Sequence, residues 1–426
     1  IFAYVRGLRA YDDARAAHKA SAEPADAPSS RDTLVVQYRG VSDSLDGAVR
    51  APDAGSYLKE RANAMMVAAL ARYYAGDLEE AARRFEQAHT EAEDAEQAEE
   101  AMWLAVVSLD GAVEADRPSL EPELRRLVEI YLRSYPSTER AARLLIRQTA
   151  VGVVDDAQAV EILLDVPETS PLYEAARRHA SGLLFRLFSA ASRSRRDFAA
   201  ARFLTVAEPL VELDRRRVIE SEPAEAAEAA DAVLTRTRQI LAVVLQTSAP
   251  DLARAEAALE TLEQIVARRQ IDLGDIRHEL DYRRLQIALH RGDEAEADRL
   301  LIALREVGGP FADAAEREAY RRAQQAWEGM RQNPALARRV LERGARVITQ
   351  FGTDDAALSS RAVQSLYDTV ARAAATLWEQ EQDSQALEQA LLLDRRLVAA
   401  DLASSSVLRR LAQHAEAAGA FDEALD

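Results

Sequence analysis

The stretch ANAMMVAALARYYAGDLEEAARRFEQA, residues 62–88, decides the fold. Its first half places apolar side chains three and four residues apart, so they gather on one face of a helix. Gly76 and Asp77 interrupt this pattern, which then resumes with the same spacing from Leu78 onward. Glycine can end a helix at positive φ and aspartate can cap the next one. The stretch therefore predicts two antiparallel helices joined by a very short turn.

The same helix–turn–helix unit returns further along the chain. The turns HRGD at 290–293 and AAGA at 417–420 each separate two apolar runs of helical period. Weaker copies begin at 250–251 and 333–334, and the expected helix starts near Ser137 and Pro171 lie 34 residues apart. A unit that repeats every 34 to 42 residues, roughly, is the signature of a helical solenoid.

Composition agrees with helices and argues against sheets. The 426 residues include 16 glycines and 13 prolines, about half the usual shares of roughly 7 and 5 %. Alanine, leucine, arginine and glutamate dominate, and all four are strong helix formers. We therefore expect an all-α chain with long helices and few turns.

The repeated unit resembles the tetratricopeptide repeat (TPR). The residues that carry this resemblance are Ala69, Gly76, Asp77, Ala81, Phe85 and Ala88 in the first copy, Gly292, Asp293, Ala297 and Leu301 in the second, and Gly419 and Ala424 in the third. Small residues let two helix backbones approach, while the large one fills the groove between hairpins. The resemblance implies a right-handed α-solenoid of antiparallel helix hairpins, that is, a TPR-like superhelix.

The chain departs from the TPR pattern at several positions. Leu285 and Leu304 stand where the family carries small residues, and the proline that closes a repeat is missing after Ala88. In the second copy this proline is displaced to Pro310. These departures leave the exact borders of the repeats open.

Two interruptions suggest how the chain is organised. Residues 21–30 read SAEPADAPSS, lack large apolar side chains and predict a flexible loop over 21–31. Residues 220–231 are acidic and alanine-rich, which fits either an insert or an exposed helix. We expect helical-repeat segments over 1–220 and 221–426, or one continuous solenoid. Because the chain opens at Ile1 and a new helix pattern starts at Phe421, we expect both ends to be cut, which leaves room for a signal or anchor outside this segment.

Charge excludes some classes of partner. The chain carries 72 acidic and 54 basic residues, a net charge of -18. Such a chain repels phosphate, so we expect no nucleic-acid partner. No apolar run reaches the 18 or more residues of a membrane span, so we expect no membrane insertion by this segment. The sequence leaves a cytoplasmic and a periplasmic or cell-envelope location open, and it does not predict the oligomeric state.

Arginine carries almost all of the positive charge, because the only lysines are Lys19 and Lys59. We interpret this mainly as codon bias in a GC-rich genome. The alternative is that arginine is chosen for bidentate contacts with carboxylates.

The sequence offers little catalytic chemistry. It has no cysteine, which excludes thiolate nucleophiles and cysteine-ligated metals. Its two nearest histidines, His278 and His290, would lie about 18 Å apart on one helix, too far for a shared metal ion. We expect the histidines to be solvated or interfacial, and the carboxylates of 91–100 to lie on a solvated face among arginines. We expect no catalytic residue, no metal and no cofactor.

The resemblance implies that partners bind on the concave face of the solenoid, which the exposed side of the first helix of each hairpin forms. The positions expected to contact a partner are Asn63, Met66, Leu70, Tyr73 and Tyr74, then Glu279, Tyr282, Gln286 and His290, and finally Arg409, Gln413 and Glu416. Their mixture of aromatic and hydrogen-bonding groups suits an extended or helical peptide. The alternative is that these side chains only cover the core.

The expected function is therefore a non-enzymatic scaffold for protein–protein interaction that binds a partner peptide or protein. Two alternatives stay open. An enzyme built on a helical toroid, of the lyase or glycosidase type, would use paired carboxylates in a deep polar pocket. The chain would otherwise be the structural repeat region of a larger cell-envelope or secretion assembly.

Overall fold

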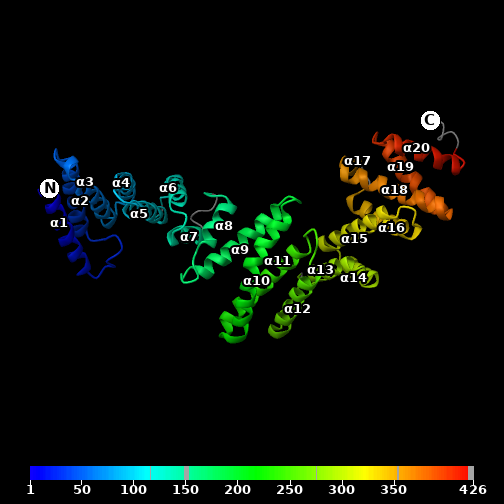
Figure 1. Cartoon of the computed structure of the whole chain (residues 1–426), viewed down its shortest axis with the longest axis horizontal. Helices are drawn as coiled ribbons and strands as arrows, with labels where there is room; N and C mark the ends of the chain where they lie inside the picture. Colours follow the sequence, from blue (N-terminus) through cyan, green and yellow to red (C-terminus); the bar gives the residue numbers. More distant parts are fainter. Residues whose placement is uncertain (116, 148–152, 275, 353–354, 421–426) are drawn as a thin grey trace. The chain divides into compact units, whose positions relative to one another are not determined.

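The described part of the chain is helical throughout. The computed structural model describes residues 1–115, 117–147, 153–274, 276–352 and 355–420, and these contain no strand (Figure 1). The α-helices are α1 (Phe2–Lys19), α2 (Asp32–Val49), α3 (Leu58–Tyr74), α4 (Leu78–Glu91), α5 (Ala95–Glu114), α6 (Glu121–Ser134), α7 (Glu139–Ile146), α8 (Asp156–Leu164), α9 (Tyr173–Ala190), α10 (Arg196–Glu220), α11 (Pro223–Val244), α12 (Leu252–Arg269), α13 (Ile276–Arg291), α14 (Glu294–Val307), α15 (Pro310–Gly329), α16 (Pro334–Phe351), α17 (Asp355–Leu358), α18 (Arg361–Glu381), α19 (Ser384–Ala399) and α20 (Ser405–Ala417). The prediction of an all-α chain is confirmed.

The chain divides into two compact units, residues 1–210 and 211–426, with the division inside α10. The boundary expected from the sequence, 220/221, coincides with the end of the same helix. Within each unit, every substantial helix contact joins a helix to its neighbour or next neighbour along the chain. Such an order of contacts is what a stack of helix hairpins produces, because each hairpin touches only the hairpins beside it.

The stretch that decided the fold forms the hairpin α3–α4 as expected. Gly76 adopts a φ of 76° and ends α3. The small residues Ala69 and Ala81 are fully buried where the two helices cross, and Phe85 is fully buried as well. The expected cap is wrong in one detail, because the Asp77 side chain makes no hydrogen bond to the start of α4.

Asp77 has stronger partners elsewhere. Its carboxylate accepts a hydrogen bond of 2.8 Å from Arg39 Nε and one of 3.2 Å from Arg72 Nη1. Charge-assisted bonds to two guanidinium groups outweigh a neutral backbone cap. The equivalent Asp293 has no such competition at its turn and caps α14 through Glu296 N at 3.1 Å.

The second unit repeats the pattern with α13–α14. Gly292 has a φ of 75°, and Ala297 and Leu301 are buried. Residues 220–231 hold the end of α10 and the first turns of α11, so this stretch is helical and is not a looped insert. In the third expected copy, Gly419 has a φ of 78°, while Phe421, Ala424 and Leu425 lie outside the described residues.

Ion pairs between arginine and a carboxylate join several helices to the next but one. Examples are Asp46–Arg84 between α2 and α4, Glu86–Arg126 between α4 and α6, Glu161–Arg202 between α8 and α10, and Asp368–Arg410 between α18 and α20. Their partners lie 38 to 42 residues apart in sequence, which matches the repeat length. Arg126 binds Glu86 through two bonds of 2.7 Å, a fork that lysine has no geometry to make. Bidentate pairing therefore accounts for part of the arginine preference.

Candidate functional site

The predicted positions of α3 lie on the side of this helix that meets α1. Asn63 Nδ2 donates a 2.6 Å hydrogen bond to the Tyr4 hydroxyl of α1. At the other end of α3, the Arg15 guanidinium lies 3.9 Å from the centre of the Tyr74 ring. Asn63 and Tyr74 are both half-buried, and their contacts with Tyr4 and Arg15 help to join α3 to α1.

The other three predicted positions of α3 are also half-buried. Met66, Leu70 and Tyr73 lie between these two ends, and none of them is exposed. Tyr73 meets Tyr74 edge-on, with ring centres 5.3 Å apart. Asn63 and Tyr74 thus join α3 to α1, and helical spacing places Met66, Leu70 and Tyr73 on the same side of α3, each partly covered. We call this side the α3 seam.

The predicted positions of α13 form a second seam, and its chemistry is ionic. Glu279 is only 7 % exposed and accepts a 2.8 Å hydrogen bond from Arg238 Nε of α11. Gln286 is buried, accepts a hydrogen bond from Arg283 at 2.9 Å and donates one to the Tyr282 hydroxyl at 3.2 Å. A partner at these positions would have to displace bonds that the chain already makes.

His290 ends this seam. The Arg322 guanidinium of α15 contacts both of its ring nitrogens. Burial, followed by the charge of Arg322, lowers the pKa of His290. The side of α13 named by the sequence is therefore held between α11 at one end and α15 at the other.

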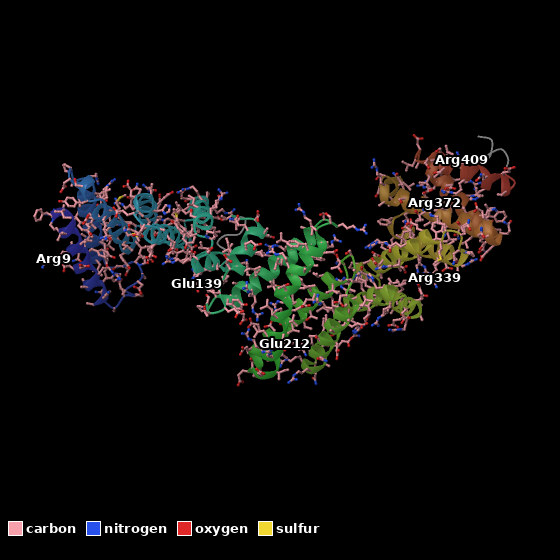
Figure 2. All side chains as sticks on the ribbon, viewed as in Figure 1. Arg9, Glu139, Glu212, Arg339, Arg372 and Arg409 are labelled. Carbon is pink, nitrogen blue, oxygen red and sulfur yellow. The ribbon has the colours of Figure 1, made fainter. Side chains whose placement is uncertain are left out.

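The predicted positions of α20 are the ones that stay open. Arg409, Gln413 and Glu416 are all exposed, and Arg409 is labelled in Figure 2, where charged tips cover the helices of both units. The neighbouring Arg410 points inward and pairs with Asp394 and Asp368. One helix therefore carries both an anchoring arginine and an exposed one.

Of the two alternatives expected for the histidines, solvated or interfacial, two histidines take the interfacial one. His18 is fully buried and His414 is 4 % exposed. Each sits among aromatic or ionic groups that the repeat packing brings together from distant positions. Sequence spacing along one helix does not reveal such surroundings.

Sequence reasoning missed an open groove between α1 and α2. Its volume is about 310 Å³, and its lining consists of Ala10, Asp13, Ala14, Gln37, Gly40 and Val41. The floor is made of small side chains. No atom lies within 4 Å of the place where a Gly40 Cβ would stand. Glycine inside a helix costs about 0.5–1 kcal/mol of stability relative to alanine. Gly40, which lies inside α2 without a packing reason, is therefore the sequence signal that could have indicated this groove.

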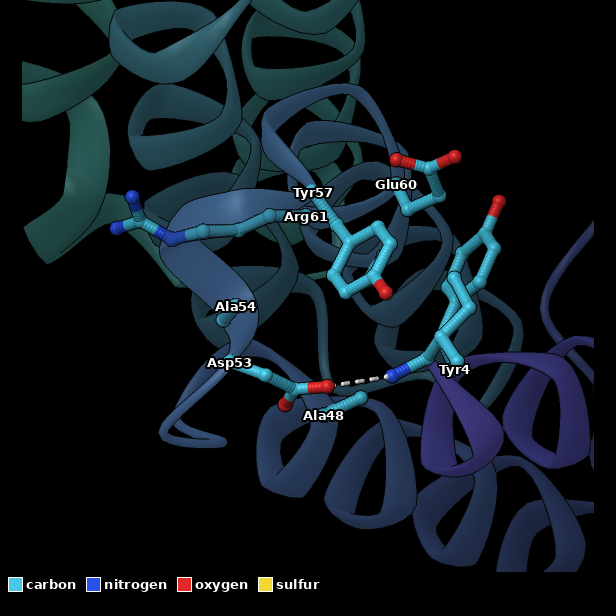
Figure 3. Close-up of a pocket in the computed structure, with 9 residues that line it drawn as sticks. Tyr4, Ala48, Asp53, Ala54, Tyr57, Glu60 and Arg61 are labelled. Atoms are coloured by element: carbon cyan, nitrogen blue, oxygen red, sulfur yellow. Dashed lines mark hydrogen bonds and ion pairs between the residues drawn. The ribbon is translucent and has the colours of Figure 1, made fainter.

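A second hollow lies at the other end of these helices and is too small for a side chain. It holds about 20 Å³, room for roughly one water molecule. Figure 3 shows the rings of Tyr4 and Tyr57 around it, with Asp53 and Glu60 at its edge. The groove between α1 and α2 is therefore the better candidate for binding a partner.

The segment 20–31, which we call the strap, connects α1 to α2, is held to α1 and α3 by two hydrogen bonds, and is closed on itself by others. Ser29 N donates to the Tyr74 carbonyl at 2.9 Å, and Arg15 Nη1 donates to the Ala25 carbonyl at 2.7 Å. Glu23 accepts hydrogen bonds from the Ser29 hydroxyl at 2.6 Å and from Ser30 N at 3.0 Å. These bonds, the one from Ser29 foremost, lower the pKa of Glu23 to about 2.

The strap covers the buried His18. Its Nδ1 lies 3.0 Å from the Tyr38 hydroxyl, and its Nε2 has no hydrogen-bond partner in the described chain. The Glu23 carboxylate of the strap stands 3.9 Å from that nitrogen. Burial first, and then the charge of Arg15, lowers the pKa of His18, while Glu23 opposes this shift.

Two specific features are absent from the described residues. No set of three or more His, Asp or Glu side chains is placed to hold a metal ion. No helix among them combines the length and apolar character needed to cross a membrane. The lining of the groove between α1 and α2 contains one carboxylate, that of Asp13.

Comparisons with known proteins add little. No family model matches the chain, and no curated protein matches it. Among solved structures it is similar to the "Structure of Naa15/Naa10 bound to HypK-THB", with 13 % identity over 92 % of this chain and 70 % of that chain and a TM-score of 0.27. It is also similar to a "Circular tandem repeat protein with novel repeat topology and enhanced subunit contact surfaces", with 14 % identity over 99 % and 93 % and a TM-score of 0.20. At TM-scores this low the matches do not define the arrangement of this chain.

Proposed function

We propose that this chain is a non-catalytic, TPR-like scaffold that binds a protein or peptide segment in the groove between α1 and α2. The groove itself is the observation that carries the proposal. A hollow of about 310 Å³ with a floor of Ala10, Ala14 and Val41 is large enough for an apolar side chain of a partner. Filling it would remove the apolar floor from water.

The rim of the groove favours a cationic segment. Asp13 is exposed and has no ion-pair partner among the described residues. Gln37 supplies a hydrogen-bonding amide on the opposite rim. Val36 stands one turn before Gly40 on α2 and is 67 % exposed, which extends the apolar surface. An amphipathic segment with one apolar anchor beside a lysine or arginine matches these three groups.

Charge over the whole chain supports the same class of partner. Ion pairs with carboxylates, within and between helices, engage many of the arginines, and the chain still carries an excess of 18 negative charges. Such an excess attracts cationic segments over a distance and raises their association rate at low salt.

A displayed peptide library tests this proposal. Binders selected on the wild-type chain should carry an apolar residue beside a basic one. Their dissociation constants are then measured by fluorescence anisotropy on Gly40→Phe, which fills the groove, and on the matched control Gly47→Phe. Both glycines are exposed on α2 with nothing within 4 Å of a new Cβ, but only Gly40 lines the groove.

We expect affinity to fall at least tenfold in Gly40→Phe and to stay within twofold in Gly47→Phe. Asp13→Lys should weaken the same peptides and reduce the dependence of binding on salt. Equal binding to both glycine variants would contradict the groove as the site. A chain that serves only as a structural repeat region would yield no selective binder in this experiment.

A further inference from the structure

His18 is a titratable group enclosed by the strap. Its side chain is fully buried, although His18 is the next-to-last residue of α1. The groups that face it are Arg15 on α1, Tyr38 on α2, Tyr74 on α3 and Glu23 on the strap. Asp26 of the strap lies against Arg15, at 3.9 Å. Three helices and the strap therefore enclose one imidazole.

The surroundings favour the neutral ring. Tyr38 and Tyr74 meet it edge-on, with ring centres 5.8 and 5.9 Å away, and offer no negative charge. Arg15 Nη1 lies 3.5 Å from Nδ1, so a second positive charge there would be repelled. The Glu23 carboxylate is the one group placed to attract it, but at 3.9 Å it stands beyond hydrogen-bond distance.

The strap depends on the same residues. Arg15 holds the Ala25 carbonyl of the strap and also lies over Tyr74, whose carbonyl accepts the hydrogen bond from Ser29 N. Glu23 closes the strap on itself through Ser29 and Ser30. Any movement of Arg15 or Tyr74 away from a charged imidazole therefore pulls on bonds that keep the strap closed.

We propose that the strap over His18 is a proton-operated latch, closed while the buried imidazole is neutral and released when that imidazole takes up a proton. Release exposes His18, Tyr38 and Tyr74 at the seam between α1 and α3. The latch operates whether or not the neighbouring groove binds a partner.

The direction follows from linkage. When the strap is open, His18 is solvated and titrates near its ordinary pKa of about 6.5. When the strap is closed, the lowered pKa disfavours proton uptake. The closed state is therefore fully stable above about pH 6.5 and loses stability as the pH falls toward the pKa of the closed form. Between pH 7.5 and 5.5 the opening constant rises by up to about tenfold, the limit set by the ordinary pKa.

Hydrogen–deuterium exchange on peptides that cover residues 20–31, corrected for the intrinsic rate at each pH, measures this opening. We expect exchange in the wild-type strap to rise severalfold, and at most about tenfold, between pH 7.5 and 5.5. His18→Gln should remove the rise. The control His278→Gln, at a half-exposed position of α13, should keep it.

Two further measurements keep the test decisive. Glu23→Gln should open the strap already at pH 7.5, because a neutral amide is a weaker acceptor for Ser29 and Ser30. If His18→Gln lost its helix content in circular dichroism, a ¹³C-histidine titration of the wild-type chain would decide, since His18 must titrate at the midpoint of strap opening. An unchanged wild-type strap between pH 7.5 and 5.5, or an equal rise in a folded His18→Gln variant, would overturn the latch.

Discussion

Helices α3 and α13 hold the same place in their hairpins, yet their seams differ in chemistry. The α3 seam is built from tyrosines, methionine and leucine, with Arg15 over the Tyr74 ring. The α13 seam is built from Glu279, which pairs with arginines of α11 and of α13 itself. The comparison shows that this kind of repeat constrains the spacing of its helices more than the chemistry that fills the seam.

Truncation of a side chain should also lower stability by different amounts in the two seams. A truncated aromatic side chain leaves a gap that neighbours partly fill. A truncated carboxylate leaves buried guanidinium groups without a counter-charge, which costs more.

Trp103 lies in the first unit, and Trp327 and Trp378 lie in the second. Variants that keep the tryptophans of one unit therefore report urea unfolding of that unit alone.

The largest effect is expected from Glu279→Ala. It should lower the unfolding free energy of the second unit by about 3 kcal/mol, because Arg238 and Arg283 lose their shared partner in a mostly buried place. Fluorescence of Trp327 and Trp378 in a Trp103→Phe background measures it. The control is the pair Glu279→Met with Arg238→Met, which should recover most of the loss. A loss below 1 kcal/mol would show that the ion pairs of Glu279 contribute little to the stability of the second unit.

A smaller effect is expected from Tyr74→Ala in the aromatic seam. About 2 kcal/mol should be lost from the first unit, since the ring is half-buried, stacks on Tyr38 at 5.5 Å and lies under Arg15. Tyr74→Phe keeps the ring and should cost less than about 0.5 kcal/mol. Trp103 fluorescence reports both values. Similar losses for the two variants would assign the effect to the hydroxyl group and contradict the stacking argument.

Acid should weaken both seams, through different histidines. The pKa of His18 in the first unit and that of His290 in the second are both lowered, chiefly by burial. The unfolded chain then binds more protons than the folded one below about pH 6.5, so stability falls as the pH drops. We expect a loss of at most about 1.4 kcal/mol per histidine at pH 5.5. Urea titrations at pH 7.5 and 5.5 should show this loss reduced in the first unit by His18→Gln and in the second by His290→Gln.

The smallest expected effect is a difference in stability between two glycine-to-alanine variants of the first unit. Gly40→Ala should stabilise the first unit by about 0.5–1 kcal/mol, because a helical glycine is replaced and nothing lies within 4 Å of the new Cβ. Gly7→Ala should destabilise it, because the new Cβ would stand 2.4 Å from Cδ2 of the fully buried Leu45. Thermal unfolding detects both signs, and a gain in both variants would contradict the packing at Gly7.

Part of the candidate site was predictable and part was not. The spacing of Glu279, Tyr282, Gln286 and His290 correctly placed these residues on one side of α13, because helical period depends on the local sequence alone. Whether that side faces solvent or the next hairpin depends on how hairpins stack. Arg238 and Arg322, which cover the two ends of this side, lie 41 residues before Glu279 and 32 residues after His290.

The amino-acid pattern alone was enough to predict a helical chain, the pairing of its helices into hairpins, and Gly76 and Gly292 as the ends of the first helix in two of them. These features depend on the local sequence, because helical period, helix propensity and the positive φ of glycine are set within a few residues. Only the tertiary structure decided that the inner side of α3 is an aromatic seam, that His18 is enclosed by the strap, and that a groove opens beside Gly40. Each of these features depends on side chains from separate helices that contact one another. The pattern of residues along one helix does not predict which residues of other helices it will contact.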